Sequence, residues 1–143
     1  MAMLNLVVVT PERQLFASKV DSVRLPTDMG QIGILPHHTE LITTISEGEL
    51  IARQKDEVYR FALHGGFAQI MGDEVIVLAD SAERVEDIDM ERAELALERA
   101  VEALQKGDLS ADERERYERR LHRAETRLRL ARRRQRSGPP KYA

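Results

Sequence analysis

Hydrophobic and polar positions follow two different rhythms along the 143-residue chain. In the first part, short apolar runs rich in β-branched residues are interrupted by Gly, Pro and Asp. Such runs, spaced roughly eight to twelve residues apart, predict a β-sandwich or barrel of many short strands. The clearest runs are residues 4–9 and 20–25, the segments 49–54 and 57–63 around Lys55-Asp56, and the segments 67–71 and 74–79 around Gly72-Asp73.

From residue 88 the apolar positions recur three and four apart, which is the period of an amphipathic helix. Asp89 is placed to cap a first helix, and Ser110 with Glu113 has the capping-box spacing before a second. Gly107 interrupts the pattern between them, so we expect an antiparallel helical hairpin. Its seam is narrow and rich in alanine, and it consists of Ala93, Leu97, Ala100, Val101 and Leu104 followed by Tyr117, Leu121, Ala124, Leu128 and Ala131.

These patterns predict an α+β chain with three parts: a β-sandwich at residues 1–87, a helical hairpin at 88–136 and a disordered tail at 137–143. The tail contains Ser137-Gly138-Pro139-Pro140, which cannot continue a helix. Because an alanine seam buries little apolar area, we expect the hairpin to be only marginally stable and able to open.

Composition narrows the classes of function. The chain has no Cys, which excludes disulfides and cysteine zinc sites, and only 4% aromatic residues with no Trp, which disfavours an aromatic platform for RNA. No apolar run approaches the roughly 18 residues that span a bilayer, so we expect membrane association only through partners. Residues 1–87 carry 7 basic and 14 acidic side chains, whereas residues 88–143 carry 15 and 11. This asymmetry predicts two modules with different partners.

No catalytic or metal-binding motif stands out, so we predict neither an enzyme nor a metal site. His37-His38 lies in a loop bounded by Pro and Gly, with no HExxH or CxxC pattern elsewhere. Gly65-Gly66 lacks the strand-to-helix setting of a phosphate loop. It indicates a backbone that needs positive φ or close packing.

Nine arginines and one acidic residue, Glu125, lie between Arg119 and Arg136. This run has three interpretations: a solvated helix face, a surface that docks onto acidic groups, or a nucleic-acid contact. The acidic first part of the chain and the scarcity of aromatic residues disfavour nucleic acid.

Four arginines have a second possible role. Arg92 and Arg99 share a face of the first helix, and Arg123 and Arg127 share a face of the second. In a folded hairpin these guanidinium groups form a cradle for a triphosphate, or they take part in ordinary helix-surface ion pairs.

The sequence as a whole resembles the ε family of ATP synthases. The resemblance rests on residues 8–13 (VVTPER), 30–38 (GQIGILPHH), 64–67 (HGGF) and 75–83 (VIVLADSAE), in this order and at this spacing. It implies a ten-stranded antiparallel sandwich, a two-helix hairpin, and a non-catalytic rotor subunit in the central stalk that binds the γ subunit and the c-subunit ring. The implied location is the cytoplasmic face of a bacterial plasma membrane, reached only through the complex.

The resemblance also implies two roles for the hairpin. When extended, it inhibits ATP hydrolysis by docking onto the catalytic β subunit through the arginine run, for which we single out Arg119, Arg120, Arg123 and Arg127. When folded, it binds ATP as a regulatory ligand, without obligatory magnesium. The family motif for ATP matches Ile88, Asp89, Arg92 and Ala93, and its accompanying residues correspond to Glu83, Arg99, Arg123 and Arg127. A stand-alone ATP-binding sensor is the alternative function.

Overall fold

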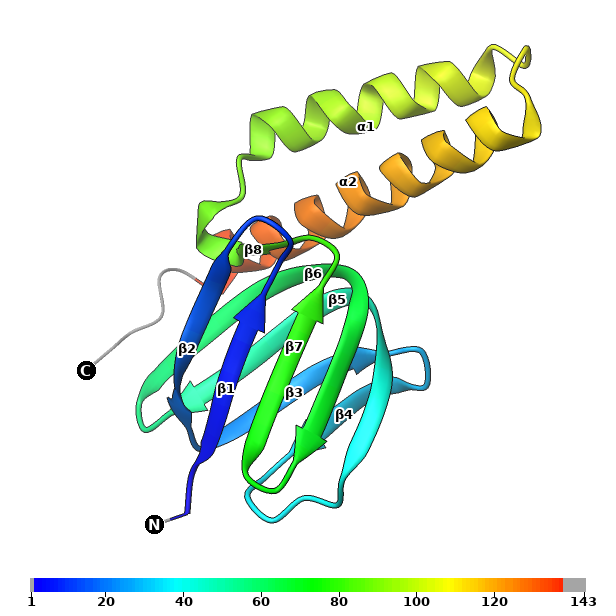
Figure 1. The fold of residues 1–143 in the computed structure, drawn as a ribbon. Coiled ribbons are helices and arrows are strands. Elements are labelled where there is room, and N and C mark those ends of the chain that lie inside the picture. Colours follow the sequence, from blue (N-terminus) through cyan, green and yellow to red (C-terminus); the bar gives the residue numbers. More distant parts are fainter. Residues whose placement is uncertain (1, 138–143) are drawn as a thin grey trace. The chain divides into compact units, whose positions relative to one another are not determined.

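The chain forms two compact units in the computed structural model, which describes residues 2–137 (Figure 1). One unit runs to Arg84 and the other begins at Val85. This boundary precedes the one expected after residue 87, because the 3-10 turn η1 (Val85–Asp87) groups with the helices. Ser137, expected in the tail, is the last residue of the second helix. The other tail residues, 138–143, lie outside the described residues.

The first unit is a β-sandwich, as predicted, and residues 2–84 contain eight strands instead of about ten. The strands are β1 (Leu4–Val9), β2 (Gln14–Val20), β3 (Ser22–Thr27), β4 (Gly30–Ile34), β5 (Leu41–Gln54), β6 (Glu57–Met71), β7 (Glu74–Ala79) and β8 (Ala82–Arg84).

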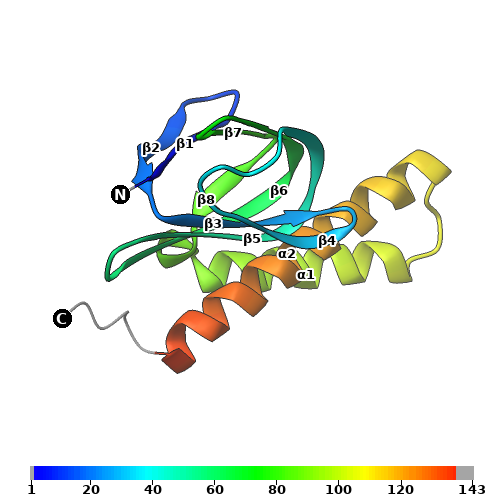
Figure 2. The same ribbon diagram turned by 90° about the horizontal axis from the view of Figure 1, so that it is seen from below.

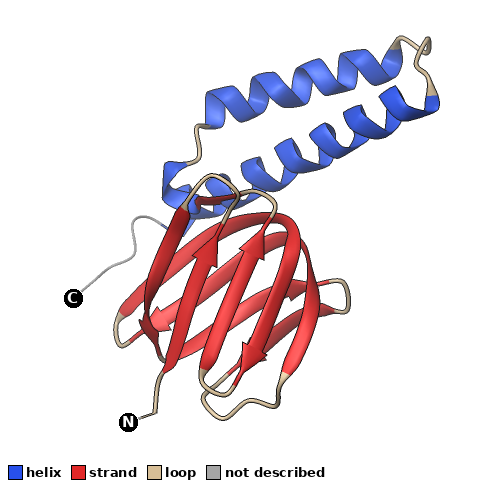
Figure 3. Cartoon of the chain, in the orientation of Figure 1, coloured by secondary structure: helices blue, strands red, loops and turns tan. Residues whose placement is uncertain are grey.

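The strands follow the order β2-β1-β7-β6-β5-β3-β4, and β8 pairs with β6. Strands β1 and β7 are parallel, and the other pairs are antiparallel. Figure 2 shows that the sheet folds over into two layers, and Figure 3 separates these strands from the helices by colour.

The strand count is lower than expected because β5 and β6 are continuous strands of 14 and 15 residues that take part in both layers. Residues 66–71 of β6 pair with β7, whereas residues 61–63 pair with β8. The change of partner occurs at Gly65 and Gly66, whose φ angles are +81° and +123°. Sequence patterns show where apolar runs stop, but they do not show that a strand bends and continues.

The sandwich core comes from alternate residues of the strands. In β1, Leu4, Leu6 and Val8 are buried. The same core cluster contains Leu25, Leu50 and other aliphatic side chains. Aromatic side chains complete it: Phe16 contacts Phe61 edge-to-face at 5.4 Å and Tyr59 at 4.9 Å between ring centroids. The outward positions include exposed apolar side chains as well as polar ones.

The second unit is the expected hairpin of α1 (Met90–Gln105) and α2 (Ala111–Ser137). The buried seam contains Ala93 and Ala100 on α1 and Ala124, Leu128 and Ala131 on α2. Val101, predicted in the seam, is 36% exposed instead, because it lies beside Ala100 on the outer side of the helix. Near the end of α2, Arg134 Nη1 donates a hydrogen bond to the Val85 carbonyl at 2.6 Å.

Gly66 tests the bend of β6. A β-carbon added to Gly66 would lie 2.1 Å from the Leu78 carbonyl oxygen, and the positive φ is strained for any other residue. We expect Gly66→Ala to lower the free energy of unfolding by roughly 2 kcal/mol or more in urea denaturation. Gly33→Ala is the control, since its β-carbon meets nothing within 4 Å. Equal stability of the two variants would contradict the close approach at Gly66.

Candidate functional site

The start of each helix has the cap that the sequence predicts. Asp89 is the N-cap of α1, and its Oδ1 accepts a hydrogen bond from the Arg92 backbone nitrogen at 3.1 Å. Before α2, Ser110 Oγ accepts from the Glu113 backbone nitrogen at 3.2 Å and bonds the Glu113 carboxylate at 3.0 Å. These caps fix where the helices begin, and therefore which side chains of α1 and α2 face each other.

A groove lies along one side of the hairpin seam. Its floor is made of small side chains, and its walls carry positive charge, with a cavity volume of about 230 Å³. The lining residues are Ala96, Arg99 and Ala100 of α1 and Tyr117, Arg120, Arg123, Ala124 and Arg127 of α2. We call this feature the arginine groove. Four guanidinium groups from two helices line one open cavity, which is a suitable environment for a multiply charged anion.

The arginine groove contains three of the four arginines expected to converge. Arg99, Arg123 and Arg127 line it, whereas Arg92 is exposed on α1 outside the set of lining residues. Arg120 is the fourth arginine of the groove, and it was expected only for docking. Ile88 and Ala93 are buried, at 4% and 0% exposure, and their role toward ATP stays a prediction.

Glu83 belongs to the sandwich. It lies in β8 opposite Ala62 of β6 and is half-buried. Nothing in this placement tests its predicted role in ATP binding, which stays a prediction.

The arginines of the run differ in their contacts and lie on both flanks of the seam. Arg119 forms an ion pair with Glu115 at 3.5 Å, whereas the Arg120 guanidinium lies over the Tyr117 ring at 5.3 Å from its centroid. A second cavity, of about 320 Å³, flanks the other side of the seam. It is lined by Leu97, Glu125, Leu128, Arg129, Arg132 and Arg133. The arginines are thus divided between opposite flanks of the seam.

The sandwich carries an apolar outer face that the sequence analysis did not predict. Ile42, Phe67 and Leu78 are 72%, 58% and 54% exposed, and Met71 is 51% exposed. Phe67 pairs directly with Leu78, so their side chains are neighbours across β6 and β7. We call Ile42, Phe67, Met71 and Leu78 the apolar face. Such a grouping on a surface is typical of a protein-binding site.

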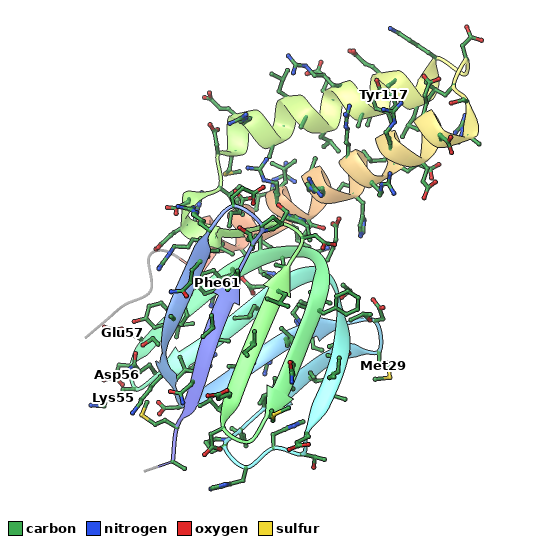
Figure 4. All side chains as sticks on the ribbon, in the orientation of Figure 1. Met29, Lys55, Asp56, Glu57, Phe61 and Tyr117 are labelled. Atoms are coloured by element: carbon green, nitrogen blue, oxygen red, sulfur yellow. The ribbon has the colours of Figure 1, made fainter. Side chains whose placement is uncertain are left out.

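At the end of β4, Ile34 is fully buried, whereas Leu35, the next residue along the chain, is 63% exposed. Met29, labelled in Figure 4, is 82% exposed at the turn between β3 and β4. His37 is held by its backbone nitrogen, which donates to Asp73 Oδ1 at 3.1 Å.

Two further properties concern residues 2–137. Among them, no three His, Asp or Glu side chains gather closely enough to hold a metal ion. Neither described helix is long and apolar enough to cross a membrane.

The fold defines a protein of two modules: a β-sandwich with an apolar face, and a helical hairpin with a cationic groove. Family models match both modules. The β-sandwich domain of the ATP synthase delta/epsilon chain matches residues 3–85, and the long α-helix domain of the same chain matches residues 86–132. The chain therefore belongs to the ATP synthase delta/epsilon chain family.

Individual relatives agree with this assignment. The chloroplastic ATP synthase epsilon chain of Pelargonium hortorum is 43% identical over 128 residues, covering 87% of this chain and 93% of the relative. The epsilon chain of Moorella thermoacetica is 42% identical over 132 residues, covering 92% and 98%.

A solved structure shows the same fold. It is a chain of the Euglena gracilis mitochondrial ATP synthase, described as OSCP/F1/c-ring, with a TM-score of 0.76 and 22% identity. The match covers 88% of this chain and 79% of the other.

Proposed function

We propose that the chain is a non-catalytic subunit of the central stalk of an ATP synthase, where it couples rotation and regulates ATP hydrolysis. The observation that carries this proposal is the family match across both compact units, residues 3–85 and 86–132. Similar folds come from the F1/c-ring part of the Euglena enzyme and from the central stalk and c-ring of the Tetrahymena thermophila enzyme. In this role the protein reaches the cytoplasmic face of a bacterial plasma membrane only as part of the complex.

The sandwich is the proposed permanent attachment to the γ subunit and the c-subunit ring. It contains the continuous hydrophobic core, and its apolar face offers Phe67 and Leu78 side by side. Exposed apolar side chains of this size gain free energy when a partner removes them from water. A rotor subunit needs an apolar contact of this kind, because it must stay bound to its partners throughout rotation.

The hairpin is the proposed regulatory element. Its seam consists largely of alanine side chains, which bury little area and allow the helices to separate. In the extended form, Arg119, Arg120, Arg123 and Arg127 meet acidic groups of the catalytic β subunit. In the folded form, the arginine groove binds ATP. A ligand that binds only the folded form shifts the population away from the inhibitory form.

Replacing Phe67 and Leu78 together by Ser tests the attachment. We expect binding to purified γ subunit to weaken at least about tenfold, because central apolar side chains dominate protein interfaces. The matched control is Leu95→Ser, which alters an apolar side chain of the hairpin that is 44% exposed. Unchanged affinity of the double variant would exclude the apolar face as the attachment site. Failure of the unmodified chain to bind γ at all would favour the stand-alone sensor.

Replacing Arg119, Arg120, Arg123 and Arg127 together by Ala tests the inhibition. Single exposed ion pairs contribute little, so we expect each single variant to have a small effect and the fourfold variant to raise ATP hydrolysis several-fold. Hydrolysis is measured in the assembled enzyme, with ATP synthesis as the check that coupling is intact. If the fourfold variant hydrolyses ATP at the original rate, electrostatic docking onto β is wrong.

ATP binding is tested by calorimetry on the isolated chain, with and without magnesium. We expect Arg99→Ala and Arg123→Ala each to weaken binding roughly tenfold or more, because each removes a charge-assisted hydrogen-bond donor from the groove. Arg129→Ala is the charge-matched control on the opposite flank of the seam. Arg92→Ala separates the family motif from the groove, since Arg92 is exposed outside it. No binding at millimolar ATP would leave these arginines with only their roles in ion pairs and helix packing.

A further inference from the structure

We infer that Arg120 is a phosphate-binding residue of the arginine groove and that Tyr117 positions it. This inference rests on the proposed ATP site in the folded hairpin. It goes beyond that proposal because neither residue belongs to the set expected to bind ATP, and Arg120 was expected only in docking.

The first argument is position. Arg120, Arg123 and Arg127 follow one another at spacings of three and four, so their side chains lie on the same face of α2. All three line the groove, and Arg99 faces them from α1. Arg120 extends this row of guanidinium groups toward the loop between the helices. A triphosphate bound by Arg99 and Arg123 would therefore lie next to Arg120.

The second argument is orientation. The Arg120 guanidinium lies 5.3 Å from the Tyr117 ring centroid, within the roughly 6 Å range of a cation–π contact. Tyr117 is half-buried and lines the same groove, and Figure 4 labels it on the hairpin. A guanidinium has five N–H donors, and a cation–π contact restricts its position without using them as hydrogen bonds to an acceptor oxygen. Arg119, one residue earlier, points instead to Glu115 at 3.5 Å.

The third argument is the composition of the lining. Ala96, Ala100 and Ala124 form the floor, and no carboxylate is among the lining residues. Four guanidinium groups that line one groove favour a multiply charged anion there, because each adds to the positive potential of the cavity. Arg120 contributes one of these four charges.

The experiment measures ATP affinity by calorimetry for the full chain and for Arg120→Ala, Arg120→Lys and Arg129→Ala. We expect Arg120→Ala to weaken binding roughly tenfold or more. Arg120→Lys should restore only part of the affinity, because an ammonium group cannot bind phosphate in the bidentate manner. Alanine is a strong helix former, so the variant keeps α2 intact. Arg129→Ala should bind ATP as the unmodified chain does.

The positioning role of Tyr117 is tested by substituting it in the unmodified chain and in the Arg120→Ala variant. Tyr117→Leu should weaken ATP binding, and Tyr117→Phe should retain it because the ring remains. In the Arg120→Ala background, Tyr117→Leu should have no further effect, since a positioning residue acts only through the group that it positions. An equal loss in both backgrounds would show that Tyr117 supports the hairpin generally and would overturn its positioning role.

The remaining outcomes separate the inference from the proposal beneath it. If the unmodified chain binds ATP and Arg120→Ala binds it equally well, the role of Arg120 is wrong and the ATP site stands. If the unmodified chain binds no ATP, the ATP site and this inference both fail. The attachment of the sandwich to γ is measured independently of either outcome.

Discussion

The hairpin must keep four guanidinium groups close together over a seam that buries mainly alanine. Ala93 and Ala100 on α1 and Ala124 and Ala131 on α2 contribute little apolar area, and Leu128 is the largest buried side chain of the seam. Repulsion within the arginine groove opposes the same packing. In the proposed function, this thin packing lets a ligand that binds only the folded hairpin shift the equilibrium toward that form.

The sandwich, unlike the hairpin, has a core of large buried side chains. Its core joins both layers through long continuous strands, and the bend at Gly65 and Gly66 lets β6 serve each layer in turn. Large side chains such as Phe61 and Leu50 are fully buried there. In the proposed function, this well-filled core supports the exposed apolar face as a lasting attachment site, whereas the hairpin is the part that opens.

Much of this architecture follows from local patterns. The alternation in Leu4–Val9 predicts β1, the turns at Lys55-Asp56 and Gly72-Asp73 are present, and Asp89 and Ser110 cap their helices as expected. These features depend on a few neighbouring residues. The apolar face was not predicted, because it arises when β5, β6 and β7 bring Ile42, Phe67 and Leu78 together from distant parts of the chain.

The set of arginines that line the groove could likewise be predicted only in part from the sequence. Spacing on one helix places Arg92 with Arg99 and Arg123 with Arg127, and it cannot show which residues of α1 lie opposite which residues of α2. That alignment depends on the loop length and on the caps. In the folded hairpin, the groove lies beside Ala96 and Arg99, which leaves Arg92 outside and includes Arg120.

This alignment also constrains how one set of arginines serves two partners. Arg120, Arg123 and Arg127 line the groove beside α1 in the folded hairpin, and Arg120 and Arg123 are exposed there. Arg129 and Arg132, on the other flank, are exposed without entering that groove. In the proposed function, a polyanion in the groove and an acidic surface of the β subunit compete for these same arginines. In the proposed function, opening of the hairpin both releases ATP and presents the arginines, because the same side chains cannot bind both partners at once.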